Sequence, residues 1–260
     1  MKKHLVCIKI GGSVITDKSK PFTADAEAMD IFAKNMAAAI KTMGDDTSFL
    51  LGNGAGSFGH VPAHEYGLDD GARGARQQYG LAFTHNCVRD LNLQLGKVLN
   101  SYLVPATCLS PGDILITRHG TISSGNTRSV SYALKNKLIP VLHGDGAYDE
   151  AKGLSIVSTE RSLLWFADTL HKSYEMVTVI AITNTGGVLD ASGSIIQTLR
   201  KNDIVVQLKS GGHDVTGSMA GKVQSLRIAA EKGYTSYIIG NNKKDLLAAI
   251  HHEPAGTQVM

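Results

Sequence analysis

Short apolar runs alternate with longer segments of helical periodicity along this chain. The apolar runs end in glycine or polar turns, a pattern that predicts β-strands. Six such strands are predicted at residues 4–10, 48–52, 106–110, 139–143, 177–183 and 236–239. Apolar residues recur at helical spacing over residues 25–43, 76–102, 161–170, 221–231 and 244–251. This alternation predicts an α/β fold with one continuous, mainly parallel sheet.

The composition is that of an ordinary globular protein and narrows the function only slightly. Charged residues make up 19% of the chain, and the net charge of +3 comes from scattered lysines and arginines, which argues against a nucleic-acid partner. No run approaches the roughly 18 apolar residues that a membrane span needs. Three cysteines, an odd number without CxxC spacing, predict a protein without disulfides in a reducing cytoplasm.

The turns after the predicted strands are candidate binding sites, because ligands of open α/β sheets gather beyond the carboxyl ends of the strands. The first turn, residues 9–13, reads KIGGS. Its glycines allow successive N–H groups to point at one anion. Lys9, with Lys18 on the loop just beyond, adds positive charge. The alternative is an ordinary turn with a solvated lysine.

The second turn, residues 52–60, reads GNGAGSFGH and is the richest in glycine. Four glycines in eight residues destabilise any regular element, so the backbone here is expected to pack tightly or to cradle a ligand. The turn lacks both the downstream acidic residue of a dinucleotide fingerprint and the GK[ST] ending of a P-loop. His60, its last residue, is either an ordinary surface histidine or a contact to an anion or hydroxyl group.

Two further turns carry weaker signals. Gly144-Asp145 follows a predicted strand but is also a common plain turn. Residues 211–221 are mostly small, which suits a polyphosphate, and they lead into a predicted helix whose first turn holds Lys222. A cation at a helix amino terminus opposes the helix dipole, so Lys222 is better explained with an anion nearby than as a solvated side chain.

Together these turns resemble the amino-acid kinase superfamily and, within it, the isopentenyl phosphate kinase family. The sequence KIGGSVITDK at residues 9–18 is similar to that family's opening, and GAGSFGH at residues 54–60 to its substrate loop. Further matches lie at Gly144-Asp145, at residues 214–217 with Lys222, and at Gly256-Thr257. The resemblance spans nearly the whole chain and implies a three-layer αβα sandwich with a central, mainly parallel sheet. It also implies a single domain over residues 1–260, with an acceptor-binding lobe at about 1–150 and a nucleotide-binding lobe at about 151–260.

The resemblance further implies a role for each matching residue. Lys9 and Lys18 would face the transferring phosphoryl group, and Glu160, where the family usually has an aspartate, would orient the lysines from a longer side chain. His60 would bind and orient the acceptor without removing a proton from it. The residues implied at the acceptor are Gly54, Ala55, Gly59, His60, Gly144 and Asp145. The residues implied at ATP are Lys9, Gly11, Gly12, Ser13, Gly56, Thr183, Asn184, Gly217 and Lys222.

The activity that follows from the resemblance is ATP-dependent phosphorylation of isopentenyl phosphate to isopentenyl diphosphate. Mg²⁺ would arrive with ATP, since the sequence offers no obvious protein cage for a metal. The family resemblance also implies a homodimer in the cytoplasm, with a small-molecule phosphate acceptor and no membrane partner.

Two alternatives remain open from the residues. A phosphonate kinase of the fosfomycin type shares the glycine-rich loop and the histidine. Tyr79 and Phe83 of the helix at residues 76–102 would line a pocket for an isoprenoid tail, or else are only core. A nucleotide-binding sensor without catalysis is the other alternative. It is motivated by Glu160 and by TNTGG at residues 183–187, where the family usually has TDVDG.

Overall fold

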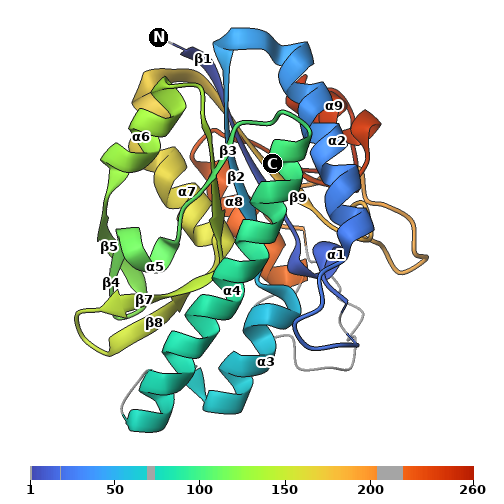
Figure 1. Ribbon diagram of the computed structural model, residues 1–260. Helices are drawn as coiled ribbons and strands as arrows, with labels where there is room; N and C mark the ends of the chain where they lie inside the picture. Colours follow the sequence, from blue (N-terminus) through green and yellow to red (C-terminus); the bar gives the residue numbers. More distant parts are fainter. Residues whose placement is uncertain (1, 18, 69–73, 204–218) are drawn as a thin grey trace.

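A central eight-stranded sheet organises the molecule, as the computed structural model shows for residues 2–17, 19–68, 74–203 and 219–260 (Figure 1). The strand order is β10-β12-β11-β9-β1-β2-β6-β3, and six of these strands, β1, β2, β3, β6, β9 and β11, run parallel. Parallel strands place all their carboxyl ends at one edge of the sheet. The strands are β1 (Lys2–Ile10), β2 (Thr47–Asn53), β3 (Ala106–Cys108), β6 (Ile139–His143), β9 (Tyr174–Ile182), β10 (Thr198–Leu199), β11 (Thr235–Ile239) and β12 (Thr257–Val259).

Helices cover both faces of this sheet (Figure 1). Helices α2 (Ala26–Met43), α4 (Ala75–Ser101) and α9 (Lys243–Ile250) pack with Ile8 of β1 in one core. Cys7, the neighbour of Ile8 on the strand, points to the second core. The helices of that second core are α6 (Thr127–Lys135), α7 (Thr159–Leu170) and α8 (Met219–Glu231). Burial on both faces explains why the strands read as continuous apolar runs, and the predicted three-layer αβα sandwich is confirmed.

A second sheet of four strands flanks the main one, in the order β5-β4-β7-β8. The prediction of one continuous sheet was therefore wrong. These strands are short and only partly buried, so polar and glycine residues interrupt their apolar pattern. The strands are β4 (Leu115–Arg118), β5 (Thr121–Gly125), β7 (Asp145–Asp149) and β8 (Gly153–Val157).

The glycine-rich turn after β2 is shorter than its composition suggested, because the helix α3 (Gly56–Tyr66) begins inside it. Glycines here and on α4 allow close packing. A Cβ at Gly59 of α3 would lie 2.4 Å from Ala55 Cβ, and a Cβ at Gly80 of α4 would lie 2.2 Å from Tyr66 Cβ. Two four-residue helices, α1 (Gly12–Ile15) and α5 (Pro111–Ile114), complete the set named here. Across the described ranges, no helix combines the length and the apolar character that crossing a bilayer requires.

Candidate active site

The predicted turns after β1, β2 and β6 lie side by side at the carboxyl edge of the eight-stranded sheet, whereas most of the turn at residues 211–221 lies outside the described residues. Ile10 at the end of β1 pairs in register with Asn53 at the end of β2 and with Ile182 at the end of β9. Asn53 in turn lies opposite His143 at the end of β6. The turns that follow β1, β2, β6 and β9 are thus neighbours, although they are spread over more than half of the chain.

Two of the glycine turns touch through their backbones. A Cβ on Gly12 would lie 2.3 Å from the Gly56 nitrogen, and one on Gly54 would lie 2.5 Å from the Gly12 nitrogen. Gly56 has φ of +51°, and its Cβ would lie 2.3 Å from Thr16 Oγ1. Real Cβ atoms do not approach this closely, so glycine is required at all three positions. The two turns therefore meet main chain to main chain, and the Thr16 side chain ties them together by donating to the Gly12 carbonyl and accepting from the Ser57 amide.

The first amide of each glycine turn is used by the sheet itself. The N–H of Gly11 donates to the Ile182 carbonyl at 3.0 Å, and the N–H of Gly54 donates to the Ile10 carbonyl at 2.9 Å. These two glycines hold the turns in place. These two amides are therefore already used and are not available to an anion.

Lys9 is a buried cation at this edge, with only 9% of its side chain exposed. Its ammonium group forms an ion pair with Glu160, which lies in the first turn of α7. Glu160 therefore contacts Lys9 although its side chain is longer than that of the aspartate that the family usually has there. Burial raises the pKa of the Glu160 carboxyl. The charge of Lys9, the hydrogen bond from Lys9 and the charge of Lys222 lower it by more, so the pKa is lowered overall and the carboxylate is favoured.

Lys222 belongs to the same electrostatic cluster. It lies in the first turn of α8 and is buried, with 9% of the residue exposed. The solvated alternative is therefore excluded for this lysine. Two lysines and one carboxylate at the ends of β1, α7 and α8 leave a net positive charge beside the glycine turns. An anion is the ligand that such a cluster attracts.

The turn after β6 is held by polar side chains that sequence reasoning missed. Thr159 Oγ1 donates to the Asn53 carbonyl at 2.7 Å, and a Cβ on Gly144 would lie 3.4 Å from that hydroxyl. Asn92 of α4 is 1% exposed and donates to Asn53 Oδ1 at 2.7 Å and to the Leu142 carbonyl at 3.2 Å. The available signal was a polar residue on the apolar face of the predicted helix.

The remaining acceptor residues are divided between surface and interior. His60 is exposed on α3, one turn after Gly56. Ala55 is the residue before α3, and a Cβ on Gly144 would lie 3.8 Å from its Cβ. Asp145 differs from them, because its side chain is fully buried and is hydrogen-bonded to the protein. The geometry assigns Asp145 to the support of the turn, and Ala55 lies beside Gly144 in it.

The nucleotide-side residues of the β9 turn join the same edge. Asn184 Nδ2 donates to the Ser13 carbonyl at 2.8 Å, which ties this turn to the first glycine turn. The Thr183 hydroxyl is buried and lies 3.3 Å from the Thr185 hydroxyl. Lys18 and Gly217, both predicted at ATP or at the transferring group, lie outside the described residues.

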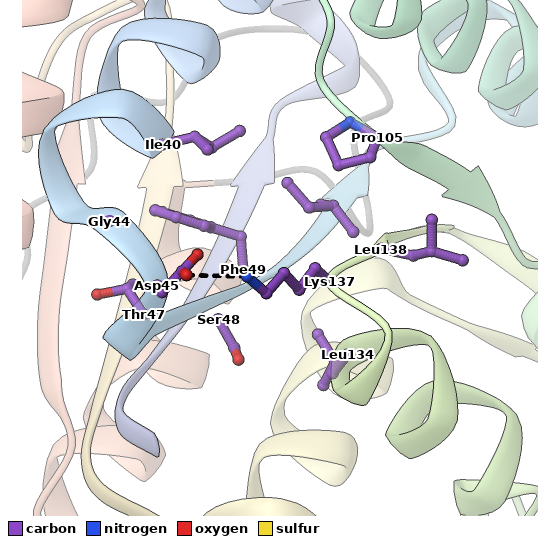
Figure 2. Close-up of a pocket in the computed structure, with 11 residues that line it drawn as sticks. Ile40, Gly44, Asp45, Thr47, Ser48, Phe49, Pro105, Leu134, Lys137 and Leu138 are labelled. Carbon is purple, nitrogen blue, oxygen red and sulfur yellow. Dashed lines mark hydrogen bonds and ion pairs between the residues drawn. The ribbon is translucent and has the colours of Figure 1, made fainter.

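A small pocket opens at the opposite, amino-terminal edge of the sheet (Figure 2). Phe49, Leu134 and Ile139 form much of its lining, and an ion pair between Lys137 and Asp45 of 2.8 Å spans its mouth. Both partners of that pair are exposed. The pocket is remote from the glycine turns, because it lies at the beginning of β2 and β6 and the turns lie at their ends.

The fold, with glycine turns and buried lysines at its carboxyl edge, is typical of small-molecule kinases. Comparison with known proteins agrees. Residues 4–241 match the sequence model of the Amino acid kinase family, so the chain belongs to that family. The resemblance found in the sequence is confirmed.

The matched relatives are isopentenyl phosphate kinases. The chain is 27% identical to the isopentenyl phosphate kinase of Methanocaldococcus jannaschii and 29% identical to that of Methanothermobacter thermautotrophicus, covering 98% of this chain and 98% of the relative in both cases. A solved structure of isopentenyl phosphate kinase matches with a TM-score of 0.80 at 26% identity, over 99% of this chain and 100% of that one. A substrate complex of isopentenyl phosphate kinase matches with a TM-score of 0.77 at 18% identity and shows the fold alone.

Proposed function

We propose that this protein transfers the γ-phosphoryl group of ATP to the phosphate of isopentenyl phosphate, forming isopentenyl diphosphate. The observation that carries this proposal is the main-chain cradle of Gly12, Gly54 and Gly56 beside the buried lysines Lys9 and Lys222. A cradle without side chains admits a phosphate group, and buried ammonium groups neutralise its charge. The full-length match to isopentenyl phosphate kinases supports this acceptor.

The chemical task of this edge is to bring two anions together. Two unit charges about 4 Å apart repel by about 4 kcal/mol at an effective dielectric of about 20. Lys9 counters that repulsion, and we propose the same role for Lys18. A preorganised donor of this kind contributes about 3 kcal/mol at the transition state. Glu160 keeps the Lys9 ammonium in position through their ion pair.

The acceptor needs orientation more than activation. A phosphate oxygen is already a nucleophile, so no residue has to remove a proton from it. Ala55, Gly59 and Gly144 would hold the acceptor phosphate through the backbone turns. His60, exposed on α3, would then orient that phosphate in line with the γ-phosphoryl group.

ATP would lie between the first glycine turn and the β9 turn. Gly11, Gly12, Ser13 and Gly56 would face its phosphates, and Thr183, Asn184, Gly217 and Lys222 would border it on the other side. Within the described ranges, His, Cys, Asp and Glu side chains form no cluster of three or more that suits a metal. Mg²⁺ would therefore be carried by the ATP phosphates, whose charge it reduces when bound.

An aromatic cluster beside α3 favours an acceptor with an apolar tail over the small polar fosfomycin. Phe22 packs edge-on against Phe58 of α3 and Phe83 of α4, with ring centroids 6.0 Å apart in both pairs. Tyr66 and Tyr79 extend the cluster, and Tyr79 stacks on Phe83 at 6.2 Å. Phe22 and Tyr79 are exposed in the absence of a partner chain or ligand. Burial of such rings against a five-carbon tail releases water and is favourable.

A substrate panel tests the proposal. The purified protein, with ATP and Mg²⁺, is assayed for ADP release against isopentenyl phosphate, dimethylallyl phosphate and fosfomycin, with ³¹P spectroscopy to identify a diphosphate product. The expected result is highest kcat/KM with isopentenyl phosphate. A preference for fosfomycin would replace the acceptor while keeping the kinase chemistry. ATP binding without turnover on any acceptor would reject the catalytic proposal.

We also propose that the enzyme works in the cytoplasm as a homodimer with the two lobes described above, as the family resemblance implies. Light scattering after size exclusion measures the mass in solution and distinguishes a dimer from a 27.6 kDa monomer.

A further inference from the structure

Asp145, the first residue of β7, is a buried carboxylate that the proposed mechanism does not use directly. Its side chain is fully buried. Oδ1 lies 2.9 Å from His85 Nδ1 and accepts from the Gly146 amide at 2.8 Å. Oδ2 accepts from the Ser110 hydroxyl at 2.7 Å and from the Gly112 amide at 3.0 Å. Each oxygen thus has two partners, which is the arrangement that a buried carboxylate requires.

These partners belong to three different elements. His85 lies on α4, Ser110 and Gly112 belong to the start of α5, and Gly146 follows Asp145 in β7. Asp145 itself follows Gly144, the residue proposed to contact the acceptor phosphate. The carboxylate is therefore the point where α4 and α5 are fastened to the acceptor turn.

The pKa values of His85 and Asp145 shift in the directions that favour their charged forms. The hydrogen bond to Asp145 raises the pKa of His85, burial opposes that change, and the charges of Asp145 and Asp113 add to the rise. For Asp145, burial raises the pKa, but the hydrogen bonds from His85 and Ser110 help to outweigh it, so the pKa is lowered overall. An imidazolium beside a carboxylate is the state that these shifts favour.

Three other ionisable residues lie around the His85–Asp145 pair, namely Asp113, Arg89 and His143. Asp113 Oδ1 lies 3.9 Å from His85 Nε2, and Arg89 pairs with Asp113 at 3.2 Å. His143 Nε2 lies 3.9 Å from Asp145 Oδ2, but this ring is completely buried, and burial lowers its pKa. His85 is therefore the nearby histidine whose protonation is favoured.

We propose that His85 is a positioning residue for the acceptor site, acting through Asp145 on the turn that presents Gly144. This inference rests on the proposed function, in which Gly144 contacts the acceptor phosphate. Without the positive charge of His85, a buried carboxylate one residue from Gly144 repels the incoming phosphate, and the link of the turn to α4 weakens from a charge-assisted to a neutral hydrogen bond. Both effects weaken acceptor binding and leave ATP binding unchanged.

The test compares His85→Gln with the wild-type enzyme in steady-state kinetics. The amide of glutamine retains a hydrogen-bond donor but carries no charge. We expect KM for isopentenyl phosphate to rise about tenfold, which is the loss of one charge-assisted contact. We expect kcat and KM for ATP to change less than twofold. Asn86→Ala, at the exposed neighbouring position on α4, is the matched control and should behave as wild type.

The pH dependence separates a charge effect from a merely structural one. Because the pKa of His85 is raised, its positive charge is present at low pH and is lost as pH rises through that pKa. The ratio of KM in His85→Gln to KM in wild type should therefore be largest near pH 6 and fall towards one at alkaline pH. Taking the ratio at each pH cancels the ionisation of the substrate itself.

Ser110→Ala provides a second variant should His85→Gln fold poorly. It removes one neutral hydrogen bond to Asp145, so KM for the acceptor should rise by a smaller factor that does not change with pH. An unchanged KM in His85→Gln, or a raised KM whose ratio to wild type is flat with pH, would overturn the inference alone. A wild-type enzyme without turnover on isopentenyl phosphate would overturn the proposed function and this inference together.

Discussion

Two ion pairs between a lysine and a carboxylate lie at opposite edges of the eight-stranded sheet, and they differ in how far their side chains are exposed to solvent. At the carboxyl edge, the side chains of Lys9 and Glu160 are 9% and 12% exposed. At the amino edge, the side chains of Lys137 and Asp45 are 67% and 83% exposed (Figure 2). Water screens the second pair, so its field extends little beyond the two groups.

The difference shows where the sheet can perform chemistry on an anion. Buried charges act through a low dielectric and are held in place by their neighbours, so the Lys9 ammonium presents a strong, fixed field. The amino-edge pocket instead offers apolar side chains and a screened pair. Among the described residues, only the carboxyl edge combines main-chain turns with buried cations.

The strongest way to break this comparison is Lys9→Met. We expect kcat to fall by about 10² to 10³, because a preorganised electrostatic donor is lost from the transition state. Steady-state assays with isopentenyl phosphate measure the effect. The variant also leaves Glu160 buried without its partner, so the double variant Lys9→Met with Glu160→Gln serves as the control. It should recover stability to urea but not activity. A double variant with wild-type kcat would remove Lys9 from the mechanism.

A second test removes space at the cradle through Gly54→Ala. The new Cβ would lie 2.5 Å from the Gly12 nitrogen, so the two glycine turns must separate. We expect kcat/KM for both substrates to fall at least tenfold, as small misplacements of reacting groups are costly. Gly193→Ala is the matched control, because a Cβ there has open space within 4 Å, although its φ of +83° adds backbone strain. Equal losses in the two variants would show that the cradle geometry is unimportant.

A third test concerns stability at the amino edge, where His4 is buried in a polar network. His4 Nε2 lies 2.8 Å from Thr178 Oγ1, which lies 2.8 Å from His252 Nε2. Burial, and then the charges of His252 and His251, lower the pKa of His4 to about 4. The unfolded chain, with an ordinary pKa of about 6.5, then binds the extra proton first. The free energy of unfolding should fall as pH drops from about 6.5 to about 4.

The variant His4→Gln should flatten this pH dependence. The expected difference between wild type and variant over that interval is on the order of 1 kcal/mol, read from urea midpoints at a series of pH values. Activity at neutral pH should be retained, since the network is at the far edge from the glycine turns. Parallel curves for the two proteins would show that His4 does not resist protonation.

The smallest effect is expected from Lys137→Ala in the exposed pair. Surface ion pairs contribute about 0 to 1 kcal/mol, so the melting temperature should hardly move and kcat/KM should stay at the wild-type value. Scanning calorimetry and the same kinetic assay measure both. A clear loss of turnover would show that the two edges are more alike than their exposure indicates.

The main sheet and its helices were predictable because burial on both faces imposes a strong pattern on the sequence. The segment at residues 4–10 is apolar except for His4 and Lys9, and the observed β1 differs from it only at the amino end. The predicted helix at residues 25–43 agrees with α2 to one residue, since Asp25 caps it by accepting from the Ala28 amide. The place of Lys222 at a helix start argued against a solvated side chain, and the residue is buried.

The misses share a different cause, which is that the decisive contacts are distant in sequence. Composition alone suggested a loop at residues 52–60, and only packing against α4 explains why Gly59 is helical. The strands β7 and β8 stabilise each other by pairing, so neither shows a clear pattern alone. The sequence around Asn92 and His85 gives no sign of their roles, because their partners Asn53 and Asp145 are distant in the chain and become neighbours only in the fold.

The backbone cradle has a consequence for how this enzyme can diversify. In the proposed mechanism, recognition of the phosphate depends on glycines that a Cβ would force apart, whereas the aromatic cluster of α3 and α4 consists of replaceable side chains such as Tyr79 and Phe83. Substrate range and phosphate capture are therefore separable in evolution and in engineering. Libraries restricted to this aromatic cluster should yield enzymes with longer or shorter acceptors, each inheriting an intact transfer apparatus.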